Sequence, residues 1–380
     1  MEKECLKMRA FLMKKVVLSA NTSWYLFNFR KNTINQIIDA GHKVYIVAPY
    51  DDYTVKLQEL GCVCINLKIS GRGMNPIKEA KTLLSFAFIY LKLRPDLIFN
   101  FTPKNNIYSA LAAYFLPAKV VNNIAGLGTA FIGKSVSEKI LVLLYKISQR
   151  RADVIFFQNN EDKKIFIDKK IACNEKSKII PGSGVDLERF HYDCRDNDGI
   201  VKFILIARLI KEKGIPEYAE AAKTLKEKYG ERVQFSLAGF IDDKNPSAVS
   251  KNDIEHWHRN GFIHFIGKTD QIEKILKEND CVVLPSYYRE GVPKSLLEAA
   301  AMGKIIVTTD NVGCRETVVD KKTGYLCKTQ STSSLASALE KVLLMDHDER
   351  VQMGIAGREY IRNRFDEKIV INEYLHCLNM

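Results

Sequence analysis

Short apolar runs rich in β-branched residues alternate with helix-length amphipathic segments along almost the whole chain. The runs are KKVVLSA (14–20), HKVYIVAPY (42–50), LIFNF (97–101), AKVVNNI (118–124), ADVIFFQN (152–159), VKFILIAR (201–208), RVQFSLAGF (232–240), IHFIGK (263–268), DCVVLPS (280–286) and KIIVTT (304–309). This alternation is typical of buried parallel strands whose connecting helices cover both faces of a sheet. The pattern therefore predicts an α/β protein.

The strands fall into two series that meet near IIPGSGVDLERF (179–190). A chain of 380 residues is also long for a single hydrophobic core. We therefore expect two doubly wound, Rossmann-like domains, over residues 1–183 and 184–362, that face each other across a cleft. The last segment, 363–380, is expected to form a helix that packs back on the first domain.

Composition narrows the class of protein. With 46% hydrophobic and 27% charged residues, the chain is globular rather than disordered or fibrous. Its nine cysteines are scattered without CxxC spacing, which favours a reducing compartment over a disulfide framework or a cysteine-rich zinc site. The longest apolar runs, such as TLLSFAFIYL (82–91), reach about half the length that a membrane-spanning helix needs.

The charge is concentrated in the first half of the chain. Residues 1–180 hold 28 Lys and Arg against 14 Asp and Glu, whereas the remaining residues carry a net charge of −2. A basic half favours an anionic partner, such as nucleic acid, phospholipid head groups or a phosphorylated substrate. Segment 134–153 spaces its apolar residues helically, so it could form either a membrane-surface helix or an ordinary helix with a solvated basic face. Its cations are Lys134, Lys139, Lys146, Arg150 and Arg151.

Two glutamates frame the stretch REGVPKSLLEA (289–299), which follows an expected strand. Glu290 lies on the loop before a predicted helix and Glu298 lies inside that helix. Backbone N–H groups from Gly291 to Lys294 would then point into the cleft at a helix N-terminus, which suits a phosphate. Alternatively, Glu290 interacts with the helix dipole and Glu298 is a solvated helix residue.

A second cluster of charge lies in ARLIKEKGI (207–215), between another strand and its helix. Arg208 and Lys213 are placed to hold a diphosphate from two sides. A pair of solvated surface charges is the alternative for these two residues alone.

Taken together, four segments of the second half strongly resemble family 4 glycosyltransferases of the GT-B fold. They are GSGVDLERF (182–190), ARLIKEKGI (207–215), HFIGKTDQI (264–272) and PSYYREGVPKSLLEAAAMGKIIVTTDNVGCRETV (285–318). The first half is similar to the family more loosely, through residues 16–49 and 100–114. Within the family, the chain looks most like bacterial enzymes that extend lipid-linked precursors of O-antigen, capsule or glycoprotein glycans.

The resemblance implies a role for each matching residue. Arg208 and Lys213 would hold the donor's diphosphate and neutralise it as it leaves, Glu290 would contact the donor sugar, and Glu298 would accept hydrogen bonds from the ribose. Such enzymes retain the anomeric configuration, by front-face attack in which a donor phosphate oxygen takes the acceptor's proton, and need no bound metal. Backbone groups around Gly267–Thr269 would pair with the nucleotide base. The catalytic residues would be Arg208, Lys213 and Glu290. The full set of implied donor-binding residues is Arg208, Lys213, Gly267, Lys268, Thr269, Glu290, Gly291, Val292, Pro293, Lys294 and Glu298.

The first domain, which would bind the acceptor, departs from the family at one place. Many members carry a histidine or an acidic residue where this chain has Ile124, Ala125 and Gly126. Front-face attack needs no enzymic base there, and glycines would let the loop approach a ligand closely. The acceptor-side candidates are Asn21, Arg30, Lys104, Asn105, Gly126 and Gly128, each of which is equally well explained by a structural role.

Two short acidic motifs match the DxD pattern of metal-dependent glycosyltransferases, but their positions argue against a metal site. DND (196–198) lies in a polar turn, and DHD (346–348) lies where aspartates cap a helix. Neither motif closes a strand, and the family that the chain resembles needs no bound metal, so we expect neither a metal nor another cofactor.

The sequence predicts a retaining glycosyltransferase that moves a sugar from a UDP-sugar to a polyprenyl-diphosphate-linked glycan. The favoured sugar is an N-acetylhexosamine such as GalNAc or GlcNAc. The enzyme would act in the cytoplasm, bound peripherally to the anionic inner face of the cytoplasmic membrane, and not on nucleic acid. The alternatives are a GT-B sugar-nucleotide epimerase, a basic nucleic-acid-binding protein and a glycosidase. Nucleic-acid binding explains the basic half but not the glutamates, and a loop and a helix beside a phosphate site are poor positions for a glycosidase pair.

Overall fold

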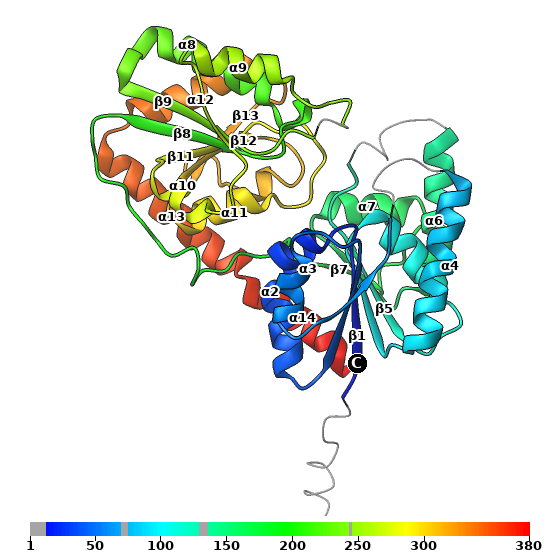
Figure 1. Ribbon diagram of the computed structural model, residues 1–380. Helices are drawn as coiled ribbons and strands as arrows, with labels where there is room; N and C mark the ends of the chain where they lie inside the picture. The colour runs from blue at the N-terminus through cyan, green and yellow to red at the C-terminus, as the bar shows by residue number, and fades with distance from the viewer. Residues whose placement is uncertain (1–12, 70–74, 129–135, 243–244) are drawn as a thin grey trace, which may run out of the picture. The chain divides into compact units, whose positions relative to one another are not determined.

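The computed structural model describes residues 13–69, 75–128, 136–242 and 245–380. The chain divides into two compact units (Figure 1), and the division falls between Ser183 and Gly184 and again between Glu367 and Lys368. Unit 1 is the N-terminal part together with the last residues of the chain, and unit 2 is the segment between them. Across the described ranges, no helix is long and apolar enough to cross a membrane.

Unit 1 is built on a parallel sheet in which seven described strands have the order β3-β2-β1-β4-β5-β6-β7. Val16 of the central strand pairs with Val44 on one side and with Leu97 on the other. The strands are β1 (Lys15–Ser19), β2 (Lys43–Ala48), β3 (Val63–Asn66), β4 (Leu97–Asn100), β5 (Lys119–Ile124), β6 (Val154–Phe157) and β7 (Ser177–Ile179).

Helices cover both faces of this sheet and bury one apolar cluster on each (Figure 1). On one face lie α2 (Ser23–Asp39), α3 (Thr54–Glu59) and α14 (Glu367–Asn379). On the other face lie α4 (Pro76–Leu93), the π-helical turn η1 (Asn105–Ser109), α5 (Ala110–Ala112), α6 (Val136–Arg151) and α7 (Asn160–Asp168). The C-terminal helix is thus part of the core of unit 1 although it is the last element of the chain.

Unit 2 repeats the architecture with six described parallel strands in the order β10-β9-β8-β11-β12-β13. They are β8 (Val201–Ile206), β9 (Val233–Ala238), β10 (His264–Gly267), β11 (Cys281–Leu284), β12 (Ile305–Thr309) and β13 (Gly324–Cys327). The helices are η2 (Lys211–Lys213), α8 (Ile215–Tyr229), η3 (Gly230–Arg232), α9 (Lys251–Arg259), α10 (Ile272–Lys277), α11 (Lys294–Ala301), η4 (Arg315–Thr317), α12 (Thr332–Leu344) and α13 (His347–Phe365).

The α/β class predicted from the alternation of apolar runs is confirmed, and each predicted run contains a strand. The pattern missed β3, β7 and β13, which are three or four residues long and lie at the edges of the sheets. Helix α13 continues to Phe365, so unit 2 extends a few residues past the expected boundary at 362.

The order of strands tells where a ligand should bind in each unit. Chain order reverses between β1 and β4 in unit 1 and between β8 and β11 in unit 2. In open α/β sheets, ligands bind beyond the carboxyl ends of the strands at such a reversal, because the two connecting segments there diverge to opposite faces. Segments that follow β1, β4, β8 and β11 are therefore the candidates for chemistry.

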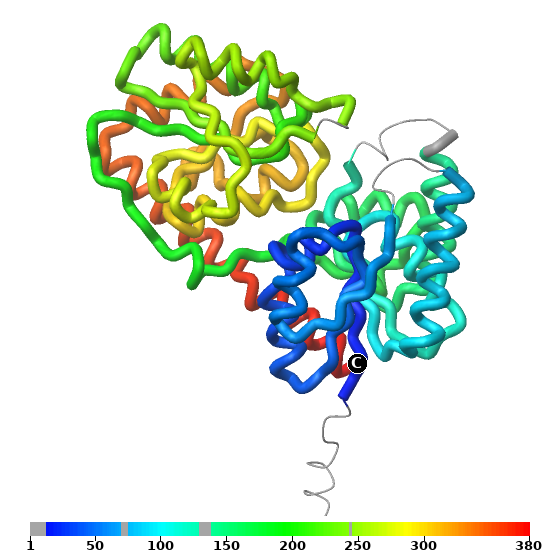
Figure 2. The backbone as a smooth tube through the Cα atoms, viewed as in Figure 1, coloured from blue at the N-terminus to red at the C-terminus, as the bar shows by residue number. Residues whose placement is uncertain are grey.

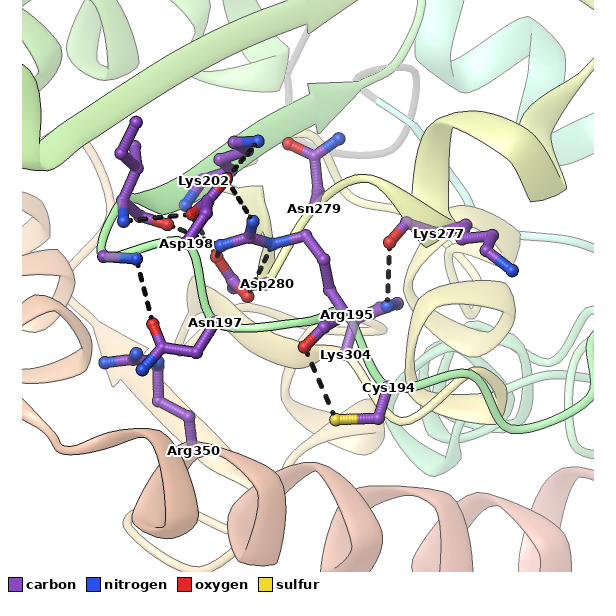
Figure 3. A network of polar contacts seen from close by, with 12 residues as sticks. Cys194, Arg195, Asn197, Asp198, Lys202, Lys277, Asn279, Asp280, Lys304 and Arg350 are labelled. Atoms are coloured by element: carbon purple, nitrogen blue, oxygen red, sulfur yellow. Dashed lines mark hydrogen bonds and ion pairs between the residues drawn. The ribbon is translucent and has the colours of Figure 1, made fainter.

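The opposite, amino-terminal edge of the unit 2 sheet is held by a polar network (Figure 3). Asp280, which directly precedes β11, accepts hydrogen bonds from Arg195 Nε (3.1 Å), Arg195 Nη2 (2.8 Å) and the backbone N–H of Lys202 (2.8 Å). Asp198 forms ion pairs with the same arginine (2.8 Å) and with Lys202 Nζ (2.9 Å). Burial lowers the pKa of Lys304, which donates to the carbonyl oxygen of Asp193 (2.8 Å). This network joins the segment before β8 to the strands of the sheet.

Both acidic motifs that resemble DxD have structural partners. Asp198 of the first motif belongs to the network just described, and Asp346 of the second is the N-cap of α13. The Asp346 carboxylate accepts from Glu349 N (2.8 Å), and Glu349 returns a bond to the Asp346 N–H (3.0 Å), which forms a capping box.

We predict that Asp280→Asn lowers the free energy of unfolding by about 2 kcal/mol, because the half-buried Arg195 loses one of its two carboxylate partners and keeps Asp198. Urea denaturation would measure this loss. Ligand binding at the carboxyl edge should stay near normal, because the network lies at the opposite, amino-terminal ends of β8 and β11. Glu255→Gln, at an exposed ion pair with Arg259, is the control and should cost less than about 0.5 kcal/mol. Equal losses in the two variants would contradict the assignment.

Candidate active site

A buried ion pair joins the two segments that flank the strand reversal of unit 2. Lys213, at the end of η2 after β8, places its Nζ 2.5 Å from Glu290 Oε2, on the loop after β11. The two side chains are only 10% and 13% exposed. Ser286 Oγ donates to the other carboxylate oxygen, Glu290 Oε1, at 2.7 Å. Sequence reasoning selected both charged residues but did not pair them with each other, and it missed Ser286.

Backbone contacts fix the loop that carries Lys213 against the loop that carries Glu290. The carbonyl oxygen of Glu212 accepts from Ser286 Oγ (3.2 Å), Tyr287 N (2.9 Å) and Tyr288 N (3.1 Å). Gly214 follows with φ +74°, and a Cβ at this position would lie 2.2 Å from the carbonyl oxygen of Pro285. Only glycine allows the two loops to approach this closely. The backbone on both sides of Lys213 is therefore held by contacts within the protein.

A third segment, after β12, supports the same loop from its other side. Asn311 Nδ2 donates to the carbonyl oxygens of Ser286 (3.3 Å) and Tyr288 (3.0 Å). Gly313 has φ +82°, and a Cβ there would lie 1.6 Å from the carbonyl oxygen of Gly291. These residues were not selected from the sequence, although their position directly after a central strand is a signal that could have identified them.

The N-terminus of α11 lies next to this ion pair in the chain. The helix begins at Lys294, and Pro293 is its N-cap residue, with no side-chain hydrogen bond to the first turn. Because proline has no N–H, the expected set of backbone donors from Gly291 to Lys294 is wrong by one member: Gly291, Val292 and Lys294 can donate, and Pro293 cannot. The positive end of the helix dipole remains on the side of the Glu290 loop.

Glu298 lies one turn into α11 and is largely buried, with its Oε1 4.0 Å from Lys294 Nζ. Burial raises the pKa of this carboxyl to about 7, against the opposing effects of Lys294 and Arg189. Arg189 itself forms an ion pair with Glu273 on α10. Neither Arg189 nor Glu273 was selected from the sequence, because they are far from Glu298 along the chain.

The remaining donor-side candidates lie along the same edge of the sheet. Arg208 follows β8 and is exposed, and no ion pair to it forms within the described part of unit 2. Gly267 ends β10, and its carbonyl oxygen accepts from Gly239 N at the end of β9 (2.9 Å). Lys268 is exposed, and Thr269 Oγ1 accepts from Gln271 N (3.0 Å). The carboxyl edge of this sheet thus gathers every residue predicted to bind the donor.

In unit 1 three of the acceptor-side candidates lie at the other strand reversal. Asn21 follows β1 and is half-buried, and Lys104 and Asn105 follow β4. Lys104 Nζ lies 2.5 Å from Glu79 Oε1 on α4. Asn105 is fully buried and accepts from Thr102 Oγ1 (2.6 Å), and its Nδ2 has no hydrogen-bond partner among the described residues.

Arg30 lies inside unit 1, where the sequence suggested an acceptor contact. Its guanidinium carbon is 4.7 Å from the centre of the Phe101 ring and 5.3 Å from that of Tyr374 on α14. Its three guanidinium nitrogens are buried with no hydrogen-bond partner in the described part of the chain. Cation–π attraction to the two rings compensates part of the cost of burying this charge. The packing assigns Arg30 the structural role rather than a direct contact with an acceptor.

A network of buried amides runs under the carboxyl ends of β1, β4 and β5. Ser19 Oγ donates to Asn100 Oδ1 (2.6 Å), Asn100 Nδ2 donates to Asn122 Oδ1 (2.8 Å), and Asn122 Nδ2 donates to Gln149 Oε1 on α6 (2.8 Å). Tyr374 of α14 donates to the side chain of Asn123. Sequence reasoning missed this network. Because its members satisfy one another, the floor of the unit 1 site is polar, uncharged and rigid.

The described part of the loop after β5 has backbone hydrogen-bonding groups but no acidic or basic side chain. Ile124 is buried, Ala125 is exposed, and Gly126 and Gly128 have φ values of +104° and +58°. Within the described residues, no group of three or more His, Cys, Asp or Glu side chains could hold a metal ion in either unit.

Two protein families match the chain, and together they cover most of it. The family described as glycosyl transferases group 1 matches residues 193–360, and the glycosyl transferase 4-like family matches residues 15–159. The N,N'-diacetylbacillosaminyl-diphospho-undecaprenol alpha-1,3-N-acetylgalactosaminyltransferase of Campylobacter jejuni is 30% identical over 92% of this chain and 94% of its own length. The chain belongs to the family 4 glycosyltransferases.

Further comparisons agree with this family. The UDP-Gal:alpha-D-GlcNAc-diphosphoundecaprenol alpha-1,3-galactosyltransferase of Escherichia coli is 26% identical to this glycosyltransferase over 71% of the chain and 72% of the relative. The Anabaena protein HepE, solved in complex with UDP and glucose, superposes with a TM-score of 0.77 at 15% identity and covers 96% of this chain and 99% of its own. The predicted GT-B fold is thereby confirmed.

We predict that Glu298→Gln stabilises this glycosyltransferase at pH 8 but not near pH 4.5. The folded-state pKa of about 7 lies above the ordinary value of 4.5, so the folded state binds more protons between these values. The carboxyl therefore costs stability that grows as the pH rises through this window, to about 3 kcal/mol, and the glutamine removes this cost.

Urea denaturation of wild type and variant at the two pH values measures this effect. Ser295→Ala, in the same helix, removes no carboxyl and should shift stability equally at both pH values. A difference between Glu298→Gln and wild type that does not depend on pH would show that burial does not perturb this group.

Proposed function

We propose that this glycosyltransferase moves N-acetylgalactosamine from its UDP-sugar to a polyprenyl-diphosphate-linked glycan, with retention of the anomeric configuration. The observation that carries the proposal is the 30% identity, over nearly the full length of both chains, to the Campylobacter enzyme whose name states that transfer. The name of the Escherichia coli relative supports a UDP-sugar donor and a diphosphoundecaprenol-linked acceptor. No observation favours the epimerase or nucleic-acid alternatives.

Lys213 would bind the donor diphosphate without giving up its partner. An ammonium group has three N–H donors, and the contact with Glu290 at 2.5 Å uses one of them. The other two can donate to diphosphate oxygens. Since Gly214 and the Glu212 carbonyl already hold this segment in place, little reorganisation is needed when the donor arrives.

Arg208 and the N-terminus of α11 would complete the binding of the leaving diphosphate. Arg208 is exposed and carries five N–H groups in a planar fork that suits phosphate oxygens. The first N–H groups of α11 and the helix dipole add positive potential on the side of the Glu290 loop. Charge that develops on the UDP leaving group is thus met by two cations and a helix end, so we propose that the reaction needs no bound metal.

Glu290 and Glu298 would position the rest of the donor. Each oxygen of the Glu290 carboxylate has one protein partner and can still accept from a sugar hydroxyl. Glu298 would accept from the ribose hydroxyls, and its ionised form is the better acceptor. Because burial raises its pKa to about 7, donor affinity should weaken as the pH falls below neutrality.

The acceptor side would supply hydrogen bonds and no general base. The loop over Ile124, Ala125 and Gly126 has no titratable side chain, and the amides beneath it are neutral. This supports front-face attack, in which a donor phosphate oxygen removes the proton of the acceptor hydroxyl. We also propose that the enzyme acts at the cytoplasmic face of the membrane, bound peripherally through its basic N-terminal half.

Lys213→Ala is predicted to lower kcat at least about 100-fold, because it removes charge stabilisation of the leaving diphosphate. Lys211→Ala is the matched control, since this lysine lies in the same turn η2 but is exposed, and it should keep near-normal kcat. UDP release, measured with a synthetic polyprenyl-diphosphate-sugar acceptor, gives both values. A Lys213→Ala enzyme with near-normal kcat would refute the role of this ammonium.

A donor screen tests substrate and metal requirement together. We expect UDP-GalNAc to give the highest kcat/KM among UDP-GalNAc, UDP-GlcNAc and UDP-Gal, with full activity in the presence of EDTA. The product would carry an α-linkage, which NMR of the released glycan identifies. Strict dependence on Mg²⁺ or Mn²⁺ would contradict the metal-free binding of the diphosphate.

A further inference from the structure

Helix α4 carries large apolar side chains on its solvent side. Its buried residues are Glu79, Thr82, Phe86 and Tyr90, which repeat at helical spacing and face the sheet. On the opposite side Ile77, Leu84, Phe88 and Leu91 are 81%, 69%, 71% and 66% exposed. A helix advances 100° per residue, so the two sets form stripes about 180° apart. The fold covers one of these apolar stripes and leaves the other open.

The open stripe of α4 borders a groove along the edge of the sheet. Ile65 and Leu67, at and just after the edge strand β3, form one wall, and Ile77, Leu84 and Phe88 form the other. Most of the lining is apolar, with Asn66, Lys81 and Ser85 as its polar members, so much of the water in this groove lies against apolar surface. Removing that water would therefore be favourable.

Neighbouring elements extend the apolar surface. Phe115, just after α5, is 96% exposed. Ile140, Leu143 and Ile147 of α6 are also exposed and recur at helical spacing. The three helices pack on the same face of the sheet (Figures 1 and 2). We refer to the exposed residues of α4, Phe115 and the exposed residues of α6 as the α4–α6 face.

Charges on the α4–α6 face are positive. The one carboxylate of α4, Glu79, is buried against Lys104, and that of α6, Glu138, is largely buried against Lys169. Neither helix therefore shows an exposed carboxylate in the described residues. The exposed cations are Lys78, Lys81, Lys92 and Arg94 at α4, and Lys139 and Arg150 on α6.

We propose that the α4–α6 face docks on a bilayer of anionic phospholipid and inserts Leu84, Phe88 and Phe115 among the lipid chains. Apolar side chains ringed by lysine and arginine, with no exposed carboxylate on either helix, match the interface of such a membrane. Long lysine side chains can lay their stems over the apolar surface and place their charges among the head groups. This docking proposal depends on the proposed function in one respect: the lipid-linked acceptor would lie in the same membrane.

From the sequence, membrane contact was expected through the basic N-terminal half, with segment 134–153 as either a membrane-surface helix or an ordinary helix with a solvated basic face. The structure adds α4 and gives it the larger apolar share, and Lys134 of the predicted segment lies outside the described residues.

Vesicle co-sedimentation of the full chain tests the proposal. Wild type should bind phosphatidylcholine vesicles that contain phosphatidylglycerol and bind pure phosphatidylcholine weakly, with binding that falls as salt screens the charges. The double variant Leu84→Gln/Phe88→Gln should bind at least tenfold less, and Lys78→Glu/Lys81→Glu should also lose binding. Val55→Gln is the matched control, because Val55 is similarly exposed on α3 at the other face of the same sheet. Since all these side chains are exposed, the Tm of each variant should stay near that of wild type.

Two further measurements separate the possible outcomes. With a short-chain acceptor in detergent, the double variant should keep wild-type kcat, and it should lose activity only with an acceptor embedded in vesicles. Equal vesicle binding by wild type and the double variant would overturn the docking surface, even if sugar transfer is confirmed. Light scattering that shows a wild-type dimer and a monomeric variant, with vesicle binding unchanged, would overturn it in favour of a contact between copies of the chain. If no sugar is transferred to either acceptor, the proposed function fails, and the sedimentation result still decides the surface.

Discussion

The ion pair between Lys213 and Glu290 is the interaction on which the organisation of the unit 2 site depends. It joins the loops after β8 and β11, the two strands between which chain order reverses. Removing two charges from water costs more than an isolated pair usually returns, so such a pair is weak evidence for stability. Here the surrounding backbone is built around it: three donors converge on the Glu212 carbonyl, and Gly214 and Gly313 permit close backbone contacts on either side. The fold thus maintains an ammonium group with unused donors at the position where the strand order predicts a ligand.

In unit 1, neutral amide groups lie beneath the carboxyl edge of the sheet. Its carboxyl edge rests on asparagines that satisfy one another, and its buried cation, Arg30, is enclosed by two aromatic rings. A floor of neutral amides carries no charge, but it can present hydrogen-bond donors and acceptors in fixed directions. This difference between the two units agrees with a reaction in which the donor side carries the charge stabilisation and the acceptor side supplies orientation.

The sequence predicted the central strands, which have a local pattern. It missed features that depend on where a side chain points or on contacts between distant residues. Apolar runs located the central strands because these are buried on both faces, whereas the short edge strands lack that signal. Position after a strand selected Lys213 and Glu290, which the structure pairs beside the strand reversal. Arg30 was also a candidate, but it lies inside α2 and its side chain turns inward. Contacts between residues far apart in the chain, such as Ser286 with Glu212 or Arg189 near Glu298, have no local signature.

Helix α4 shows why hydrophobicity along a chain cannot by itself assign burial. The run 82–91 is typical of a core helix, yet Phe86 and Tyr90 are buried while Leu84, Phe88 and Leu91 are exposed. A helix that is apolar on both sides needs two covers, and within unit 1 the sheet provides one. Keeping the second side apolar is unfavourable for solubility unless something covers it. For an enzyme whose proposed acceptor is confined to a membrane, docking there also raises the effective concentration of the acceptor, since enzyme and substrate then share one surface. The exposed stripe and the basic charge of unit 1 then have a common explanation, which neither the apolar run nor the charge count supplies alone.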